Sequence, residues 1–154
     1  MGYEVSNFSR LESKRNVDNR SKHNRKYWNF SPYLGMGPSA HSYLNRTRYW
    51  NQRNVKGYID AISKGMLPVA EKEVLTETQQ MIETIYLGLR TKEGISIRYF
   101  ERTFGISFRK IFDETLEALI EEKMIGISEK RCFLTQKGMV FSDSIANRFI
   151  QVLP

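Results

Sequence analysis

The chain has 154 residues, of which 24 are Lys or Arg and 17 are Asp or Glu, so its formal net charge is +7. This length suits one domain or parts of two, and 40% apolar with 27% charged residues is typical of a chain that folds around a core. Its one cysteine, Cys132, excludes an intramolecular disulfide and a self-contained iron–sulfur or zinc centre. No apolar run approaches the roughly 18 residues of a membrane span, and no signal-peptide pattern opens the chain, so we expect no membrane span and a cytoplasmic location.

The positive charge is concentrated in the first third of the chain. Residues 1–56 contain eleven Lys or Arg against three Asp or Glu, a net charge of +8, whereas the remainder carries −1. Within that third, residues 10–26 have almost no apolar side chain, which predicts a basic loop. Lys and Arg interleaved with Tyr and Trp are also typical of RNA-binding surfaces. No RNA-binding signature accompanies them, however, and a solvated loop is the favoured interpretation.

Short strand-like segments lie on either side of this loop. Residues 3–6, 33–37 and 43–44 have the alternation or the side chains that strands favour. Gly35 and Gly37 permit a tight turn with close backbone approach, either at the ligand end of a barrel strand or in a plain turn. His41 lies just beyond this turn. It either faces such a site or packs in the core, and we favour the core position.

From residue 54 onward the pattern is helical. A short helix is expected first, and Gly65 and Pro68 end it. Its apolar face carries Val55, Ile59 and Ile62. A second helix begins with a capping box at residues 76–79. Its core-facing side chains repeat at helical spacing and are Met81, Ile82, Ile85 and Leu89.

Two further helices, a hairpin and a last helix are expected after residue 94. Ser96 caps a short helix that Gly105 ends, and Ser107 opens a longer helix that reaches Lys123. The apolar stripe of this longer helix is Phe108, Ile111, Phe112, Thr115, Leu116, Leu119 and Ile120. A hairpin follows at residues 125–134, and a last helix with Val140, Ile145 and Phe149 turned inward begins at residues 135–138. This order describes a winged-helix-like domain.

A winged-helix nucleic-acid-binding protein is therefore the alternative function, because the second helix of such a unit commonly enters the DNA major groove. The charges of that helix oppose it. Its five carboxylates outnumber its three cations, so it would repel phosphates; the carboxylates are Asp113, Glu114, Glu117, Glu121 and Glu122. We favour a packing and docking role for the domain, since fold does not determine function.

Several segments together resemble one known family, the oxygen-independent coproporphyrinogen III oxidase-like proteins. In the first third of the chain these segments are residues 3–8, 23–28, 33–42 and 48–51. Residues 87–90, 93–95 and 133–138 resemble the C-terminal domain of the same family. The segments keep the order and spacing of the family, and the resemblance spans nearly the whole chain.

The His-Asn-x-x-Tyr-Trp pattern of residues 23–28 is similar to the haem-chaperone (HemW-like) branch more than to the porphyrinogen-oxidising (HemN) branch. The resemblance implies a radical S-adenosylmethionine barrel, whose Cys-x-x-x-Cys-x-x-Cys motif holds a [4Fe–4S] cluster, followed by a helical C-terminal domain. This sequence has no such motif. We therefore interpret the chain as the C-terminal part of a longer protein, and we expect the cluster and S-adenosylmethionine only in the missing N-terminal region.

The sequence thus predicts an α+β chain. Residues 1–53 are expected to be the terminal strands of a radical-SAM-type barrel together with the basic loop, and residues 54–154 the helical, winged-helix-like domain. We expect this piece to have no redox activity and no catalytic residue of its own. Its expected partners are haem or a porphyrin, the missing N-terminal barrel and a haem-accepting protein.

For haem, the resemblance implies that His23 is the iron ligand, that Tyr27 and Trp28 pack near the porphyrin, and that Arg25 and Lys26 meet its propionates. A neutral imidazole suits iron, aromatic rings suit a flat macrocycle, and cations suit carboxylates. A histidine in a basic loop is also typical of a merely solvated side chain, and that alternative stays open. His41 is the second candidate ligand.

Overall fold

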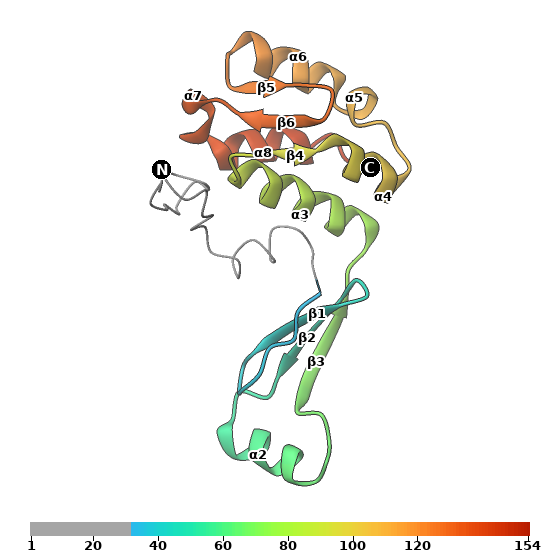
Figure 1. Cartoon of the computed structure of the whole chain (residues 1–154), viewed down its shortest axis with the longest axis vertical. Coiled ribbons are helices and arrows are strands. Elements are labelled where there is room, and N and C mark those ends of the chain that lie inside the picture. The colour runs from blue at the N-terminus through green and yellow to red at the C-terminus, as the bar shows by residue number, and fades with distance from the viewer. Residues whose placement is uncertain (1–31) are drawn as a thin grey trace, which may run out of the picture. The chain divides into compact units, whose positions relative to one another are not determined.

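The computed structural model describes residues 32–154. They belong to two compact units, residues 32–76 and residues 77–154, and both helices and strands are present, so the chain is α+β (Figure 1). The units divide between Thr76 and Glu77, later than the boundary at residue 53 that the sequence analysis expected. The reason is that strand β3 (Val69–Val74) pairs with the sheet of the first unit.

An antiparallel three-stranded sheet of order β1-β2-β3 forms the centre of residues 32–76. Strands β1 (His41–Leu44) and β2 (Thr47–Asn51) are joined by Asn45 and Arg46, whose φ angles of +50° and +61° are those of a tight hairpin turn. The sequence predicted a strand-like segment at residues 43–44 and none at residues 47–51, so β2 was not predicted. Residues 34–37, expected to be strand, form a loop, and Tyr33 alone pairs with Tyr43.

Helix α2 (Val55–Ser63) connects β2 to β3 and confirms the first predicted helix. Asn54 caps it, because its side-chain oxygen accepts a hydrogen bond from Gly57 N at 3.0 Å. The apolar face of α2 remains exposed, and only Ala61 of this helix is buried. The exposed side chains are Val55 at 60%, Ile59 at 56% and Ile62 at 51%. This face therefore lies outside the core that the described residues form.

Residues 77–154 fold as helices around a second antiparallel sheet, of order β4-β6-β5. The elements are α3 (Glu77–Arg90), β4 (Ile95–Ser96), α4 (Ile97–Phe104), α5 (Phe108–Ile111), α6 (Asp113–Glu121), β5 (Ile125–Ile127), β6 (Arg131–Leu134), α7 (Gln136–Met139) and α8 (Ser142–Ile150). The predicted caps of α4 are confirmed, since Ser96 Oγ accepts from Tyr99 N and Gly105 ends the helix with a φ of +69°. The predicted cap at Ser107 is wrong, because Ser107 precedes α5 but makes no side-chain cap hydrogen bond. The predicted hairpin is β5 and β6; strand β4, which completes the sheet, was not predicted.

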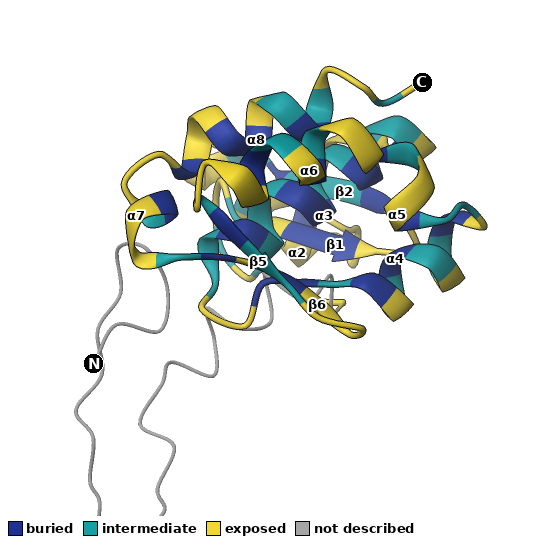
Figure 2. Ribbon diagram, turned by 90° about the horizontal axis from the view of Figure 1, so that it is seen from above, coloured by how far each residue is buried: buried dark blue, intermediate teal, exposed yellow. Residues whose placement is uncertain are grey.

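Five phenylalanines form the centre of this unit. The buried parts of its helices and strands are dark blue in Figure 2. The ring of Phe100 on α4 meets those of Phe104, Phe108 and Phe112 edge-to-face, with centroids 4.8, 5.2 and 5.8 Å away. Phe149 on α8 meets Phe112 at 5.0 Å. Phe100, Phe108, Phe112 and Phe149 have no exposed surface. The aromatic cluster therefore joins α4, α5 and α8 in one core.

Two predicted helices are each split in the structure. The helix expected from Ser107 to Lys123 divides at Phe112, whose φ of −110° and ψ of 16° are not helical, into α5 and α6. The last helix divides in the same way at Phe141 into α7 and α8. Ile145 and Phe149 are buried as predicted, whereas Val140 is 79% exposed, because it lies at the junction of α7 and α8 rather than on an inward helix face.

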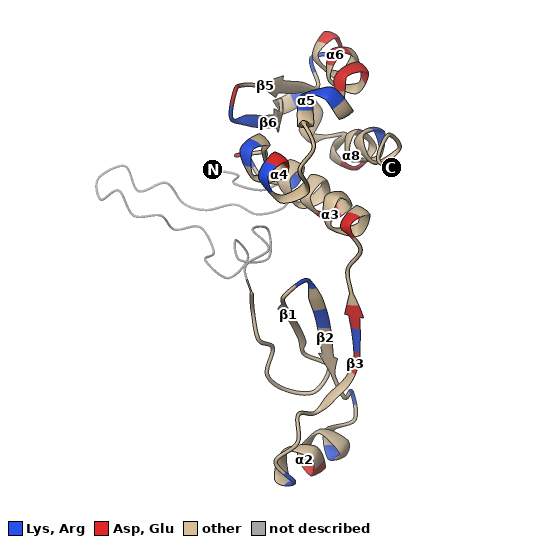
Figure 3. Cartoon of the chain, turned by 90° about the vertical axis from the view of Figure 1, so that its right-hand side faces the viewer, with Lys and Arg blue, Asp and Glu red and all other residues tan. Residues whose placement is uncertain are grey.

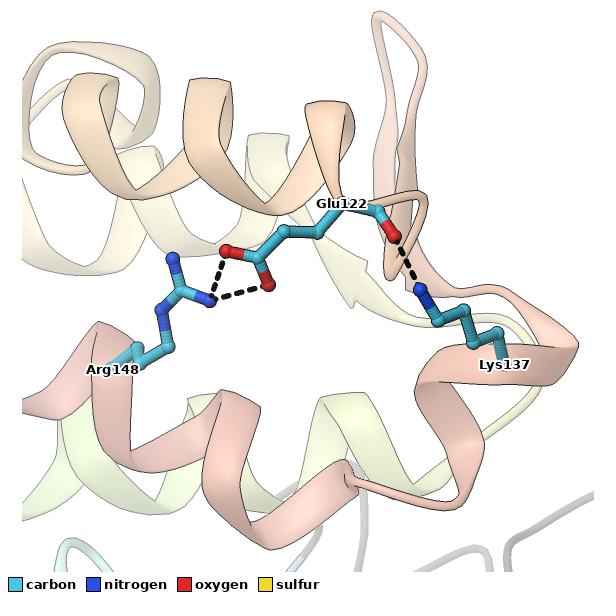
Figure 4. A network of polar contacts seen from close by, with 3 residues as sticks. All are labelled: Glu122, Lys137 and Arg148. Atoms are coloured by element: carbon cyan, nitrogen blue, oxygen red, sulfur yellow. Dashed lines mark hydrogen bonds and ion pairs between the residues drawn. The ribbon is translucent and has the colours of Figure 1, made fainter.

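Glu122 connects the end of α6 to α7 and α8 (Figure 4). Both of its carboxylate oxygens accept from Arg148 Nη1 at 2.9 Å, and its backbone carbonyl accepts from Lys137 Nζ at 3.0 Å. The charged side chains are partly exposed, so the pair adds little stability of its own. The Glu122–Arg148 pair nevertheless links the end of α6 to α8.

We predict that Phe112→Ala destabilises residues 77–154 by about 3–5 kcal/mol, because it removes a fully buried ring and leaves a cavity among Phe100, Phe108 and Phe149. The measurement is the free energy of unfolding by urea, followed by circular dichroism. Ile120→Ala is the control, since Ile120 on α6 is 43% exposed and should cost much less. Equal losses in the two variants would show that the aromatic cluster is not the core of this unit.

Candidate functional site

Of the residues predicted to bind haem, only His41 belongs to the described part of the chain. His23, Arg25, Lys26, Tyr27 and Trp28 lie outside the described residues. His41 is described, and it begins strand β1. The geometry of a candidate site therefore comes from the glycine turn at residues 35–39 and from the strands beside it.

Side chains from three elements hold the glycine turn. Asn51, at the end of β2, donates from Nδ2 to Gly37 O at 3.0 Å and to Gly35 O at 3.4 Å. Gly35 N donates to Ser42 Oγ at 3.0 Å, and Gly37 N donates to Tyr58 Oη at 3.1 Å. Both peptide groups of the turn are thus fixed by buried or half-buried polar side chains, which is the arrangement of a preorganised loop.

Both glycines are required by the backbone. A Cβ at Gly35 would collide with the backbone carbonyl of His41, and Gly37 has a φ of +105°, which side chains disfavour. The predicted close backbone approach is therefore present, and the approaching group is strand β1 of the same chain. The turn carries two exposed apolar side chains outward, Leu34 at 82% and Met36 at 86%.

The residues that hold this turn were not predicted from the sequence. Asn51 belongs to the segment of residues 48–51 that carries the family resemblance, but nothing in the sequence shows that its amide bonds a loop 14 residues earlier. Tyr58 is a further case, since its hydroxyl lies 21 residues from its partner Gly37. Such contacts depend on the hairpin register, and β2 was not predicted.

His41 is exposed, so the favoured prediction that it packs in the core is wrong. The physical reason is its place in the sheet, where it faces Trp50 across the two strands. The imidazole and indole rings are neighbours, with centroids 6.0 Å apart and planes tilted by 31°. Tyr43 and Arg48 form the next pair on the same face, because side chains alternate along a strand.

Cys132 lies in strand β6 and has no exposed surface. Burial raises the pKa of its thiol from 9.0 to about 12, and the nearby Arg109 guanidinium acts in the opposite direction. The thiolate that iron requires is therefore not available from the folded chain near neutral pH. A single buried thiol does not fit a [4Fe–4S] cluster. Residues 32–154 also contain no group of three His, Cys, Asp or Glu side chains placed to hold a metal ion.

Helix α6 presents an acidic surface in the structure as in the sequence (Figure 3). Its exposed carboxylates are those of Asp113, Glu114, Glu117 and Glu121. A helix of this charge repels the phosphates that a recognition helix must approach. The described part of the chain contains no helix long and apolar enough to cross a bilayer.

We predict that Asn51→Asp loosens the glycine turn, because a carboxylate has no proton to donate to Gly35 O and Gly37 O. Leaving these acceptors unpaired should cost about 1–3 kcal/mol. Amide hydrogen exchange should become faster at Gly35 and Gly37. Gln52→Glu is the matched control, since the Gln52 side chain is only half buried and bonds neither carbonyl. Unchanged exchange in Asn51→Asp would contradict this role of Asn51.

We further predict that the Cys132 thiol of the folded protein reacts slowly with a disulfide reagent at pH 8 and rapidly in denaturant. Its pKa is about 12 in the folded state and near 9.0 in the unfolded state, so the unfolded chain ionises first. The contribution of the neutral thiol to stability is therefore present below pH 9 and is lost as the pH rises toward 12. Rapid reaction of the native protein at pH 8 would contradict the burial of Cys132.

Known proteins resemble this chain in sequence and in fold. Residues 75–141 match the family model described as the HemN C-terminal domain. The heme chaperone HemW of Bacillus subtilis (strain 168) is 34% identical to this chain over 148 residues, which are 96% of this chain and 38% of that protein. The heme chaperone HemW of Lactococcus lactis subsp. lactis (strain IL1403) is also 34% identical, over 96% of this chain and 37% of its own length.

A solved structure supports the same assignment at the level of the fold. It is coproporphyrinogen III oxidase (HemN) from Escherichia coli, described as a radical SAM enzyme, and it matches with a TM-score of 0.59 and 22% sequence identity. The match covers 80% of this chain and 29% of that enzyme. The chain spans less than half the length of these relatives. Residues 75–141 are therefore a HemN C-terminal domain, and the chain as a whole is similar to part of the heme chaperones named HemW.

Proposed function

We propose that the chain is the haem-binding C-terminal part of a haem chaperone of the HemW type. The observation that carries this proposal is the similarity to two proteins named heme chaperone HemW over 96% of the chain. The likeness to a coproporphyrinogen III oxidase is weaker and concerns the fold alone. We therefore favour the chaperone branch over a porphyrinogen-oxidising oxidoreductase as the parent protein.

Haem is the cargo in this proposal, and His23 is its iron ligand. Tyr27 and Trp28 contact the macrocycle, while Arg25 and Lys26 pair with the propionates, in keeping with the ligand preferences of iron, aromatic rings and carboxylates. Residues 1–53 are the end of a radical-SAM-type barrel, and the cluster and S-adenosylmethionine bind elsewhere in that barrel. A protein that accepts haem is the further partner.

The C-terminal unit serves in packing and docking. The order of α3, β4, α4, α6, β5 and β6, with the sheet order β4-β6-β5, supports a winged-helix-like description of residues 77–154. Its acidic α6 makes nucleic acid an unsuitable partner. A cytoplasmic location stays a prediction from the sequence.

Haem titration of the full chain tests the proposal. We expect the wild type to develop a saturable Soret band, and His23→Ala to bind haem about tenfold more weakly or worse, because the iron loses a strong ligand. Ser21→Ala is the control, since it alters the same segment without removing a ligand atom suited to iron. A wild type without a saturable Soret band would show that the chain does not bind haem, and equal affinities would show that His23 is not the ligand.

A further inference from the structure

One face of the β1–β2 hairpin carries the exposed imidazole of His41 and the partly buried indole of Trp50 side by side. His41 and Trp50 are cross-strand neighbours, 6.0 Å apart between ring centroids, and we name them the His41–Trp50 face. Within residues 32–154, no hydrogen bond or ion pair occupies the imidazole of His41, whose ring contact is with Trp50. Both nitrogen atoms of an exposed imidazole are thus open to a ligand.

Imidazole nitrogen and thiolate are strong protein ligands of haem iron. The chain has two histidines and one cysteine, and Cys132 is fully buried. His41 is therefore the one imidazole of the described residues, and it lies on the surface, whereas the only thiol does not. If an imidazole or a thiolate of residues 32–154 binds the iron, that ligand is therefore His41.

We propose that His41 and Trp50 form a second haem contact, in which His41 binds the iron and Trp50 lies against the macrocycle. This inference rests on the proposed haem binding and extends it from His23 to a described surface of the chain. The ligand class is an iron porphyrin, bound on one side by an imidazole.

The ring geometry determines how the indole meets the macrocycle. An imidazole that binds iron stands upright on the porphyrin, because its ring plane contains the iron–nitrogen bond. The indole plane is tilted by only 31° from that of the imidazole, so Trp50 also stands steeply on the macrocycle and meets it by its edge. Edge-to-face contact is a favoured arrangement of aromatic rings.

The charges beside the face orient the propionates. Arg48 lies two residues before Trp50 on the same face of β2, and its guanidinium forms an ion pair with Glu73 at 3.9 Å. Glu71 stands opposite Trp50 on β3 and repels carboxylates. Arg48 is the cation of this face that would meet a propionate, in exchange for its contact with Glu73.

The test compares the full-length wild type with His23→Ala, His41→Ala and the double variant in haem titrations followed by the Soret band. We expect His23→Ala to retain a saturable Soret band and the double variant to lose it. His41→Gln repeats the measurement with a side chain that keeps polarity at this exposed position. Circular dichroism confirms that each variant is folded.

A second comparison tests the indole. Trp50→Leu should weaken haem binding in the His23→Ala background by about three- to tenfold, through loss of the edge contact. Tyr49→Leu is the matched control, because Tyr49 is the neighbouring residue of β2 and lies on the opposite face of the sheet. Equal losses in the two variants would remove Trp50 from the contact.

The outcomes separate this inference from the proposed function. If the wild type binds haem and His23→Ala is indistinguishable from the double variant, the second contact is wrong and the proposed function stands. If His41→Ala removes the Soret band and His23→Ala does not, the second contact is supported and the role of His23 is wrong. If the wild type has no saturable Soret band, both are wrong.

Discussion

Packing of phenylalanine rings is the interaction on which the unit of residues 77–154 depends. Phe100, Phe108, Phe112 and Phe149 come from separate segments of the chain and have no exposed surface. Burial of each ring contributes about 1.5–3 kcal/mol, and their edge-to-face contacts fix the angles at which the helices meet. The break between α5 and α6 occurs at Phe112, one of these rings. The position of acidic α6 is thus a consequence of the aromatic core.

Residues 32–76 are organised differently, around polar contacts. The glycine turn is held by the amide of Asn51 and by two hydroxyl groups, while the apolar side of α2 stays exposed. Hydrogen bonds are directional, so they specify the conformation of a loop more closely than apolar contacts of the same strength. The turn therefore keeps a defined shape in a unit that buries few large apolar side chains.

Periodicity predicted the helical half of the fold well and the hairpin half poorly. Met81, Ile85 and Leu89 repeat at helical spacing and are buried, and the caps at Ser96 and Gly105 depend on local chemistry alone. The breaks at Phe112 and Phe141 escaped prediction, because the apolar stripe continues at helical spacing across a single non-helical residue. A sequence pattern records spacing but not the backbone angles of one residue.

The candidate site was predictable only where its chemistry is local. The glycine turn was predicted from its residue types. The exposure of His41, in contrast, follows from the hairpin register. The roles of Asn51 and Tyr58 follow from contacts between residues distant in the sequence. The register in turn depends on the hairpin turn at Asn45 and Arg46. Both residues have a positive φ, and neither is a glycine. Without the usual glycine, the turn gave no strong signal, and β2 was missed.

The charges of residues 77–154 do not fit the DNA binding that a winged-helix-like order of elements would suggest. The sequence predicted the order of elements of a winged-helix unit, yet exposed carboxylates occupy the helix that would meet the phosphates in such a unit. The apolar stripe of α5 and α6 and their outward charges lie on different faces, so the core can be kept while the surface changes. The surface determines the partner, and the carboxylates of α6 do not suit a polyanion.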